Sequence, residues 1–454
     1  MRIGEPENES FLQLRKKAVV QNDSSEVLPH VNTKQPEHTH NSWGGMHRTL
    51  SQLLSSSAAS QNIGKKRSML ILSEADVRQC LPIELAIEAN KRALGSLRKA
   101  GDGGATVPTR IGLPYRGAVL AGDDAGDKAS DWTLFKPAMY EPANDSKNDG
   151  NCQTSLMGMK LVSVRGNNPS MGLPTVPATV MLVDCKTGIA NALLGGTFLT
   201  AARTAAGSAI ATDCMTPADH TKPLHLLVFG AGLQAEMHID AIRSVRPNIG
   251  RISIVNRSAG RAEKLIALTR EKLKESDEDI DLDMDVTLLE DRDAVKNVVS
   301  SADIICTTTN TTTPLFSGSW VKPGCHLNGV GSYTANMEEI SSEFISTRCQ
   351  VVIDTPEAIN VGDLKGISDK SENYVGLLGD VLAGNVLLTN HWKRKRANGT
   401  GGGSGGNNNN NNNNSYVYDC TMFKSVGTAI QDVITAHEVY QEAIRRGVGM
   451  EVEM

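Results

Sequence analysis

The sequence predicts an α/β protein built on a parallel, doubly wound sheet, and two observations support this fold class. Short apolar strands alternate with helical stretches in the second half of the chain, and a glycine-containing turn joins the first strand to the first helix. Alternation of this kind is typical of a parallel sheet covered by helices. The expected elements are a strand over 224–229, a helix from Gln234, a strand over 252–255, a helix from Arg261, and short strands at 304–305 and 351–353.

The residues before 203 predict a second, α+β part of the fold. Leu70-Ile71-Leu72 is expected to form a strand, and Ser73 is expected to cap a helix with Glu74 and Asp76 in its first turn. An amphipathic helix over 423–446 is expected to pack back on this part. The other expected elements are a helix from Pro82 to near Gly101, a strand over 134–140, hairpin strands over 159–164 and 178–183, and a helix of small residues over 201–212.

Changes in composition predict the limits of the domains. Residues 1–68 are polar and without apolar periodicity, so we expect a disordered tail. Residues 69–202 and 416–454 are assigned to the α+β domain, and residues 203–389 to the doubly wound domain. Residues 390–415, rich in Gly and Asn, predict a flexible surface loop. The basic run at 393–396 is interpreted as a charged loop edge, with a nuclear-localisation or phosphate-binding patch as the alternative.

Composition and charge favour small molecules as partners. The chain has 454 residues, a formal net charge of −5 and a pI near 6.1, which does not indicate nucleic-acid or membrane binding. The eight cysteines form no C-x-x-C pair, so neither a zinc site nor a disulfide framework is predicted. No apolar run approaches the roughly 18 residues that cross a bilayer, and no secretory signal is evident. We therefore expect a cytoplasmic protein without a metal.

The glycine-containing turn predicts a dinucleotide site. Gly230-Ala231-Gly232-Leu233-Gln234-Ala235 fits the pattern G-x-G-x-x-G/A, lies after an expected buried strand and opens a helix. The glycines permit a tight turn and let the backbone approach a pyrophosphate, and the N–H groups at the start of the helix favour the anion. This context indicates a Rossmann domain.

The end of the next strand favours NADP(H) over NAD(H). An NAD-binding protein usually carries an acid there, which holds the ribose hydroxyls. This chain has Asn256-Arg257-Ser258 instead. An arginine can pair with a ribose 2′-phosphate, and no carboxylate repels it. The alternative is that Arg257 is only a solvated residue after the strand.

Several ordered motifs together resemble the ornithine cyclodeaminase/μ-crystallin family from Met69 to Gly447, apart from the insertions. The matching stretches are 157–164, 168–169, 172–176, 199–206, 230–235 and 423–427. The resemblance implies a Rossmann domain inserted in a substrate-binding and dimerisation domain made by both chain ends. It also implies a homodimer that acts on a small amino- or imino-acid substrate.

The resemblance also suggests roles for individual residues. Arg110 would hold the substrate carboxylate, which suits the fork of a guanidinium. Lys160 would bind the carboxylate or pass a proton; without the resemblance it would be an ordinary strand lysine. Arg203 would lie between the cofactor phosphate and the substrate unless it points to solvent, and Glu357 would be an acid on the substrate side. The other positions expected at the cofactor are Thr175, Thr307, Val330, Ser332 and Ser425.

Ser332 distinguishes between activities within the resemblance. Cyclodeaminases carry an aspartate after the glycines of the segment that corresponds to 328–331, and this chain has Ser332 there. A serine hydroxyl does not replace a carboxylate as general base near neutral pH. We therefore expect NAD(P)H-dependent reduction of a small cyclic ketimine or α-imino acid. The alternatives are ornithine cyclodeamination, a non-catalytic NADPH-dependent ligand-binding protein, and amino-acid synthesis for a secondary metabolite.

Overall fold

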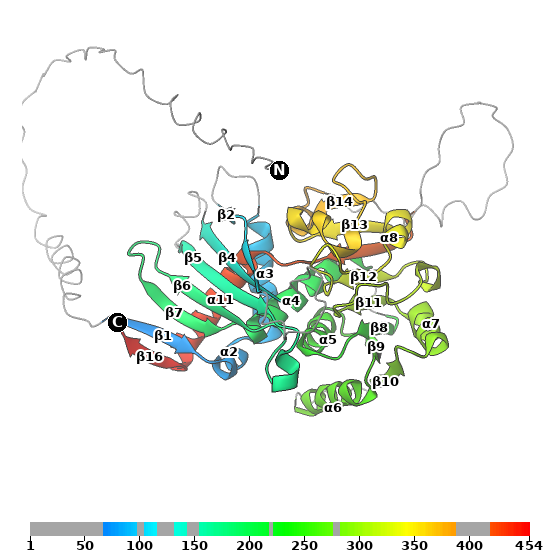
Figure 1. The fold of residues 1–454 in the computed structure, drawn as a ribbon, viewed down its shortest axis with the longest axis horizontal. Helices are drawn as coiled ribbons and strands as arrows, with labels where there is room; N and C mark the ends of the chain where they lie inside the picture. The colour runs from blue at the N-terminus through cyan, green and yellow to red at the C-terminus, as the bar shows by residue number, and fades with distance from the viewer. Residues whose placement is uncertain are drawn as a thin grey trace, which may run out of the picture. The chain divides into compact units, whose positions relative to one another are not determined.

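The computed structural model describes residues 67–97, 104–115, 131–142, 154–217, 221–275, 282–386 and 418–454 (Figure 1). The expected low-complexity loop at 390–415 and its basic run lie outside these residues. So does the expected tail up to residue 66, whereas Ser68, assigned to the tail, begins the first strand.

An eight-stranded mixed sheet forms the first part of the fold, in the order β16-β1-β7-β6-β5-β4-β2, with β3 also paired to β4. Its β1 and β7 are parallel and its other pairs are antiparallel. The expected hairpin of β5 and β6 is confirmed, with longer limits for β5. The strands are β1 (Ser68–Leu72), β2 (Gly104–Thr106), β3 (Ile111–Tyr115), β4 (Asp131–Glu141), β5 (Leu156–Val164), β6 (Ala178–Val183), β7 (Ala190–Gly195) and β16 (Met450–Glu453).

Helices α2 (Glu74–Cys80) and α11 (Ala429–Arg446) pack on this sheet, and α3 (Ile83–Gly95) packs on α11. Ser73 caps α2 as expected, because its hydroxyl accepts from the Asp76 N–H and the Asp76 carboxylate accepts from the Ser73 N–H. Helix α11 lies along β4, β5 and β6 (Figure 1). Close approach is possible at Gly158, where an added Cβ would lie 2.6 Å from the Met181 carbonyl oxygen and 3.3 Å from Val433.

The second sheet has eight strands, all parallel, in the order β10-β9-β8-β11-β12-β15-β13-β14. The strand order changes direction between β8 and β11, and ligands of doubly wound sheets bind at the carboxyl edge beside such a point. The predicted α/β fold class is thereby confirmed. The strands are β8 (Leu224–Phe229), β9 (Ile249–Asn256), β10 (Asp283–Leu288), β11 (Ile304–Thr307), β12 (His326–Gly329), β13 (Cys349–Ile353), β14 (Tyr374–Leu377) and β15 (Cys420–Lys424).

Helices and short 3-10 turns connect the strands of the second sheet. The helices are α5 (Leu233–Val245), α6 (Ala259–Glu275), α7 (Arg292–Ser301), α8 (Ser342–Arg348) and α9 (Leu378–Leu382), and the 3-10 turns are η3 (Gly318–Trp320), η4 (Pro356–Asn360) and η5 (Gly362–Leu364). A further turn, η2 (Asn168–Met171), lies between β5 and β6.

The end of the chain differs from the prediction of one amphipathic helix over 423–446. Residues 420–424 form β15, fully buried between β12 and β13, and the helix begins only at Ala429. Gly427, with φ +77°, lies in the turn between them. The chain therefore passes through the second sheet before α11 returns to the first, so the expected domain limit at 416 does not follow the sheets.

Helix α4 (Thr197–Met215) is longer than expected and crosses the expected domain limit at 202/203. Every residue over 198–212 is buried, and the helix contacts α3, α5, α11, β12 and β15. Its Ala, Gly, Ser and Thr side chains permit this packing because a small side chain allows a neighbouring element to approach closely. No helix within the described ranges is long and apolar enough to span a membrane.

Candidate active site

A row of basic residues extends from the residue before β3 across β4 and β5 of the first sheet. Lys136 of β4 lies directly opposite Lys160 of β5, and both side chains are almost fully buried. Arg110 directly precedes β3, whose first residue, Ile111, pairs with Phe135 of β4, and the charge of Arg110 acts on Lys136. Like charges directly opposite one another in a sheet destabilise it. The row therefore requires nearby anions.

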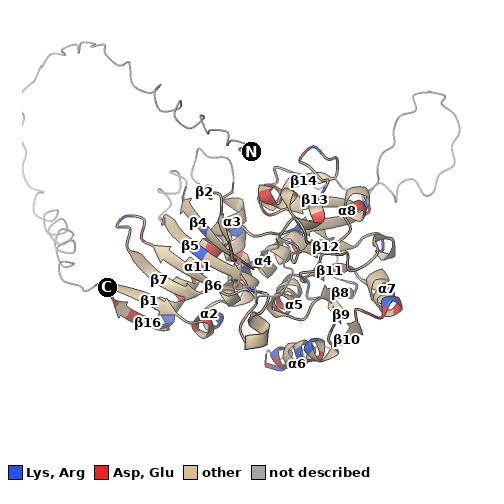
Figure 2. Ribbon diagram, viewed as in Figure 1, with Lys and Arg blue, Asp and Glu red and all other residues tan. Residues whose placement is uncertain are grey.

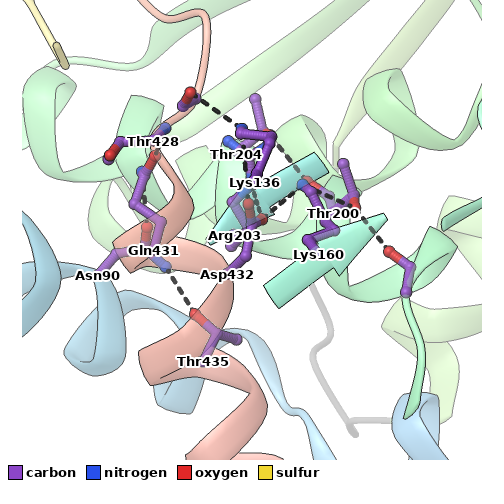
Figure 3. Close-up of polar contacts among 12 residues, drawn as sticks. Asn90, Lys136, Lys160, Thr200, Arg203, Thr204, Thr428, Gln431, Asp432 and Thr435 are labelled. Carbon is purple, nitrogen blue, oxygen red and sulfur yellow. Dashed lines mark hydrogen bonds and ion pairs between the residues drawn. The ribbon is translucent and has the colours of Figure 1, made fainter. Parts of the chain in front are cut away.

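One buried carboxylate, that of Asp432 in the first turn of α11, faces this row (Figure 3). Its Oδ1 lies 2.6 Å from Lys160 Nζ and 2.9 Å from Arg203 Nε, and its Oδ2 lies 3.5 Å from Lys136 Nζ. Lys160 also donates to the Thr200 hydroxyl, at 3.3 Å. Asp432 thus joins β4, β5, α4 and α11 at one point.

Hydrogen bonds at the start of α11 hold Asp432 in place. The Thr428 N–H donates to Gln431 Oε1 at 3.0 Å, which forms part of a capping box. Gln431 Nε2 donates to Asn90 of α3 at 2.8 Å, and Asn90 donates to Thr435 (Figure 3). These residues are buried, so the position of the carboxylate is fixed by its surroundings.

The burial and charges of the cluster shift the pKa values of its members. Burial lowers the pKa of Lys136 to about 8, against the attraction of Asp432, and the charges of Arg203 and Arg110 lower it further. Burial also lowers the pKa of Lys160 well below its usual value. For Asp432, burial alone would raise the pKa, but the charges of Arg203, Lys160 and Lys136 outweigh burial and hold it well below its usual range. The cluster therefore contains an ionised acid and two lysines that give up their protons more readily than usual.

The turn after β15 connects this cluster to the second sheet. Asp354, at the end of β13, accepts hydrogen bonds from Ser425 Oγ at 2.7 Å and from the N–H groups of Val426 and Gly427. The Gly427 carbonyl accepts from Lys136 Nζ at 3.1 Å. A Cβ on Gly427 would lie 2.3 Å from Arg203 Nη1, so only glycine leaves room for the guanidinium.

At the carboxyl edge of the second sheet, the glycine turn has the properties that a dinucleotide requires. Gly230 has φ +109°, and an added Cβ would lie 2.6 Å from the Thr308 hydroxyl. A Cβ on Gly232 would meet only open space, so the backbone before α5 is accessible to a ligand. Gln234 Oε1 is buried and has no partner among the described residues, so it is free to accept from a ligand. Ala235 is fully buried behind the turn.

Glu339 binds the chain segments at and after the carboxyl ends of β11 and β12. Its carboxylate accepts from the Thr307 hydroxyl at 2.8 Å, the Thr309 N–H at 2.6 Å, and the N–H groups of Gly331 and Ser332 at 2.8 and 3.1 Å. Burial raises its pKa from the usual value, and the charge of nearby Asp363 adds to this rise. Thr307 and Ser332 are themselves buried, and Ser332 Oγ donates to the Met337 carbonyl. Two residues predicted at the cofactor, Thr307 on β11 and Ser332 after β12, thus bind the same carboxylate.

The turn after β9 is exposed and basic. Arg257 and Ser258 are exposed, and Asn256 Nδ2 donates to the Ser258 carbonyl at 2.9 Å. A hollow beside the glycine turn is lined by that turn and by α5 and α6, and its charged residues are Glu236, Arg261 and Lys264. Figure 2 shows acidic and basic residues interspersed along α6, which supplies the last two.

Comparison with known proteins identifies the family. The model of the ornithine cyclodeaminase/mu-crystallin family matches residues 147–391. The chain belongs to this family. An uncharacterized cyclodeaminase of Dictyostelium discoideum is 30% identical over 403 residues, covering 85% of this chain and 100% of that protein. The predicted family resemblance is thereby confirmed.

Two further family members have named reactions. A Δ1-pyrroline-2-carboxylate reductase of Bacillus cereus is 32% identical over 304 residues, covering 65% of this chain and 80% of the relative. The structure of Thermococcus litoralis Δ1-pyrroline-2-carboxylate reductase in complex with NADH and L-proline has a TM-score of 0.65 at 27% identity, covering 85% of this chain and all of that chain. These relatives agree with the predicted enzyme class, an NAD(P)-dependent oxidoreductase acting on C=N bonds.

Two residues predicted at the site, Thr175 and Glu357, lie outside the hydrogen-bond network around Asp432. Thr175 lies between η2 and β6, where its carbonyl accepts from the Arg165 N–H. Glu357 is exposed on η4 and accepts a hydrogen bond from the Thr355 hydroxyl. Within the described ranges, no hydrogen bond or ion pair joins either residue to the Asp432 cluster.

Sequence reasoning missed four residues of the site: Lys136, Asp354, Glu339 and Asp432. Lys136 carried a signal, because it lies two residues before the buried Ala138 in β4 and therefore on the same face of the strand. Asp432 also carried one, because it interrupts an apolar run between Ile430 and Val433.

Proposed function

We propose that the chain reduces the C=N bond of a small α-imino acid or cyclic ketimine with NADPH. The observation that carries this proposal is the buried group of basic residues around Asp432. Lys136 of this group donates to the carbonyl of Gly427, which follows β15 of the second sheet, where the glycine turn lies. A substrate carboxylate would relieve the excess of positive charge there. The reductases of the same family support the reaction class.

Arg110 and Lys160 are proposed to bind the substrate carboxylate. Arg110 lies at the half-buried end of the basic row, and its guanidinium can bind a carboxylate with two parallel hydrogen bonds. Lys160 is held by Asp432 and Thr200, so its Nζ has a fixed position. Arg203 Nη1 is buried without a partner among the described residues and is available to the same ligand. Together these groups would fix the orientation of the C=N bond.

The reaction adds a hydride to the imine carbon and a proton to the imine nitrogen, which yields an amine and oxidised cofactor. When bound, the cofactor supplies the hydride. Lys160 is the proposed source of the proton, because burial makes its ammonium more acidic than an exposed lysine. A protonated imine accepts hydride more readily, so this proton assists the transfer.

The dinucleotide is proposed to lie along the turn at 230–235, with the N–H groups of α5 facing its pyrophosphate. Arg257 is proposed to bind the 2′-phosphate of NADPH, assisted by Arg261 and Lys264 beside the turn. Arg257→Ser should lower kcat/KM for NADPH about tenfold or more while changing that for NADH less than threefold. Equal loss with both cofactors would reject NADPH specificity. Arg270→Ser on α6 serves as a control of equal charge.

The buried state of Ser332 argues against cyclodeamination. Ser332 is fully buried and its hydroxyl donates to the Met337 carbonyl, and it lies so close to Gly362 that a Cβ added to that glycine would clash with it. This position therefore supplies no carboxylate to act as a base.

A homodimer is proposed from an exposed apolar face. Ile111, Leu113 and Tyr115 alternate along β3 and are more than half exposed, and Trp132 lies on the neighbouring β4. Large exposed apolar patches mark interaction sites, and a second copy of the chain is the proposed occupant. Light scattering should give twice the monomer mass for the full chain and the monomer mass for Leu113→Asp.

The test of the function is a screen for oxidation of NADPH by the purified chain. The substrates are Δ1-pyrroline-2-carboxylate, Δ1-piperideine-2-carboxylate, and pyruvate with simple amines. Oxidation of NADPH with at least one of them is the expected result. In parallel, the chain is incubated with L-ornithine and catalytic NAD⁺, and ammonia is measured. Release of ammonia without turnover of any imine would reject the proposed reaction.

A further inference from the structure

The charges around the site leave a surplus that one carboxylate does not neutralise. Four cations, Arg110, Lys136, Lys160 and Arg203, face or adjoin the cluster. Among the described residues, the acids whose charges act on Lys136 are Asp432 and Asp354. The difference between four positive and two negative charges is two. A bound monocarboxylate therefore leaves one buried positive charge unmatched.

Lys136 has hydrogen-bonding capacity that its protein partners do not use. Its ammonium has three hydrogens. Among the described residues it donates to the Gly427 carbonyl at 3.1 Å and lies 3.5 Å from Asp432 Oδ2, which is longer than a good hydrogen bond. The side chain is only 5% exposed, so bulk water does not supply the missing partners. A ligand can therefore add a stronger contact than Asp432 provides.

Lys136 also lies in the right place to contact a different part of the substrate from Lys160. It occupies the middle of the basic row, between Arg110, which precedes β3, and Lys160 on β5. Lys136 donates to the Gly427 carbonyl, and Gly427 lies against the Arg203 guanidinium, whose Nη1 is buried and has no hydrogen-bond partner in the part of the chain that the structure describes. Two adjacent cationic donors, each with unused capacity, form a second anion position beside the one assigned to the substrate carboxylate.

We infer that Lys136 determines specificity by binding a second carboxylate, so that the preferred substrates are α-imino acids with two carboxylates. This inference rests on the proposed function. Two carboxylates balance the surplus of two positive charges, so both are desolvated with partners. The same surplus repels a substrate with an ω-ammonium group, because like charges in a buried site are strongly unfavourable. Ornithine and lysine are therefore excluded by charge.

The test compares imines of equal carbon number that end in a carboxylate or in a methyl group. Ammonium is mixed with oxaloacetate or 2-oxobutyrate, and with 2-oxoglutarate or 2-oxovalerate, and ammonium-dependent oxidation of NADPH by the full chain is measured. We expect the dicarboxylic member of at least one pair to have a kcat/KM about tenfold higher or more. Lys136→Met should abolish this preference, whereas Lys136→Arg should keep it. Lys186→Met, an exposed lysine after β6, is the matched control.

A binding measurement separates specificity from catalysis and from misfolding. Succinate should raise the melting temperature of the wild-type chain more than butyrate does, and this difference should disappear in Lys136→Met. Equal losses of kcat/KM on both members of each pair, or a wild-type chain without a preference, would overturn the inference. Turnover of monocarboxylic imines alone would overturn the role of Lys136 and keep the proposed function. Turnover of no imine at all would reject both.

Discussion

Replacing Asp432 by Asn tests the central electrostatic feature of the structure. The substitution keeps the shape of the side chain and one acceptor oxygen but removes the carboxylate that, among the described residues, contacts Lys136, Lys160 and Arg203. Two charge-assisted hydrogen bonds, at 2.6 and 2.9 Å, lose the charge of their acceptor. Such bonds contribute about 1.5–3 kcal/mol each, and a buried charge left unpaired costs about 3–5 kcal/mol. We therefore expect the free energy of unfolding to fall by about 3–5 kcal/mol.

The assay is urea unfolding followed by circular dichroism, with Asp293→Asn as the control. Asp293 lies in the first turn of α7 and is exposed. Like Asp432→Asn, its replacement removes a carboxylate that interacts with a helix N-terminus, but here the carboxylate is not buried. That interaction contributes about 0.3–1 kcal/mol. Adding Lys136→Met to Asp432→Asn should recover part of the loss, because it removes one of the unpaired charges. If Asp432→Asn costs no more than the control, the carboxylate does not hold the cluster together.

Two other predictions concern the turn after β15 and the ionisation of Lys136. Gly427→Ala should lower kcat/KM for imines at least tenfold by displacing Arg203, whereas Gly188→Ala, with a similar φ of +73° and open space around it, should leave kcat/KM unchanged. If both variants lowered kcat/KM by the same factor, backbone strain alone would explain the loss. Because the pKa of Lys136 is about 8, kcat/KM for dicarboxylic imines should fall above that pH, and Lys136→Arg should move the fall to higher pH. The folded pKa of Lys136 is below the usual 10.5, so the unfolded chain binds more protons and the free energy of unfolding should rise with pH between about 8 and 10.5. Lys136→Met should reduce this rise in urea titrations, whereas the contribution of Lys160, whose pKa burial also lowers, should remain.

Local patterns in the sequence predicted much of the fold. The strand at 224–229, the glycine turn and the helix after it carry an unmistakable order of apolar, glycine and helix-forming residues. β15 was missed because a short, fully buried strand has no alternation, so 423–424 merged with the following helix pattern. Its pairing with β12 and β13 is set by contacts distant in sequence, which a local pattern does not contain.

The site was predicted only where a motif carried it. Arg203 and Lys160 were found through stretches typical of the family, and the structure brings both to Asp432. Asp432 itself was missed because an acid in the first turn of a helix is common at exposed helix starts. Its burial follows from the packing of α11 against β4, β5 and α3. The balance of charge in the cluster is therefore a property of tertiary structure.

The most direct test of the proposed reaction is to follow the hydride. The chain is incubated with NADPH carrying deuterium at the transferable position of the nicotinamide, together with Δ1-pyrroline-2-carboxylate. The proline formed is then examined by mass spectrometry and NMR. The structure-based proposal predicts proline with one deuterium at Cα and an equal amount of NADP⁺. Unlabelled proline, or no proline while L-ornithine yields ammonia, would contradict it.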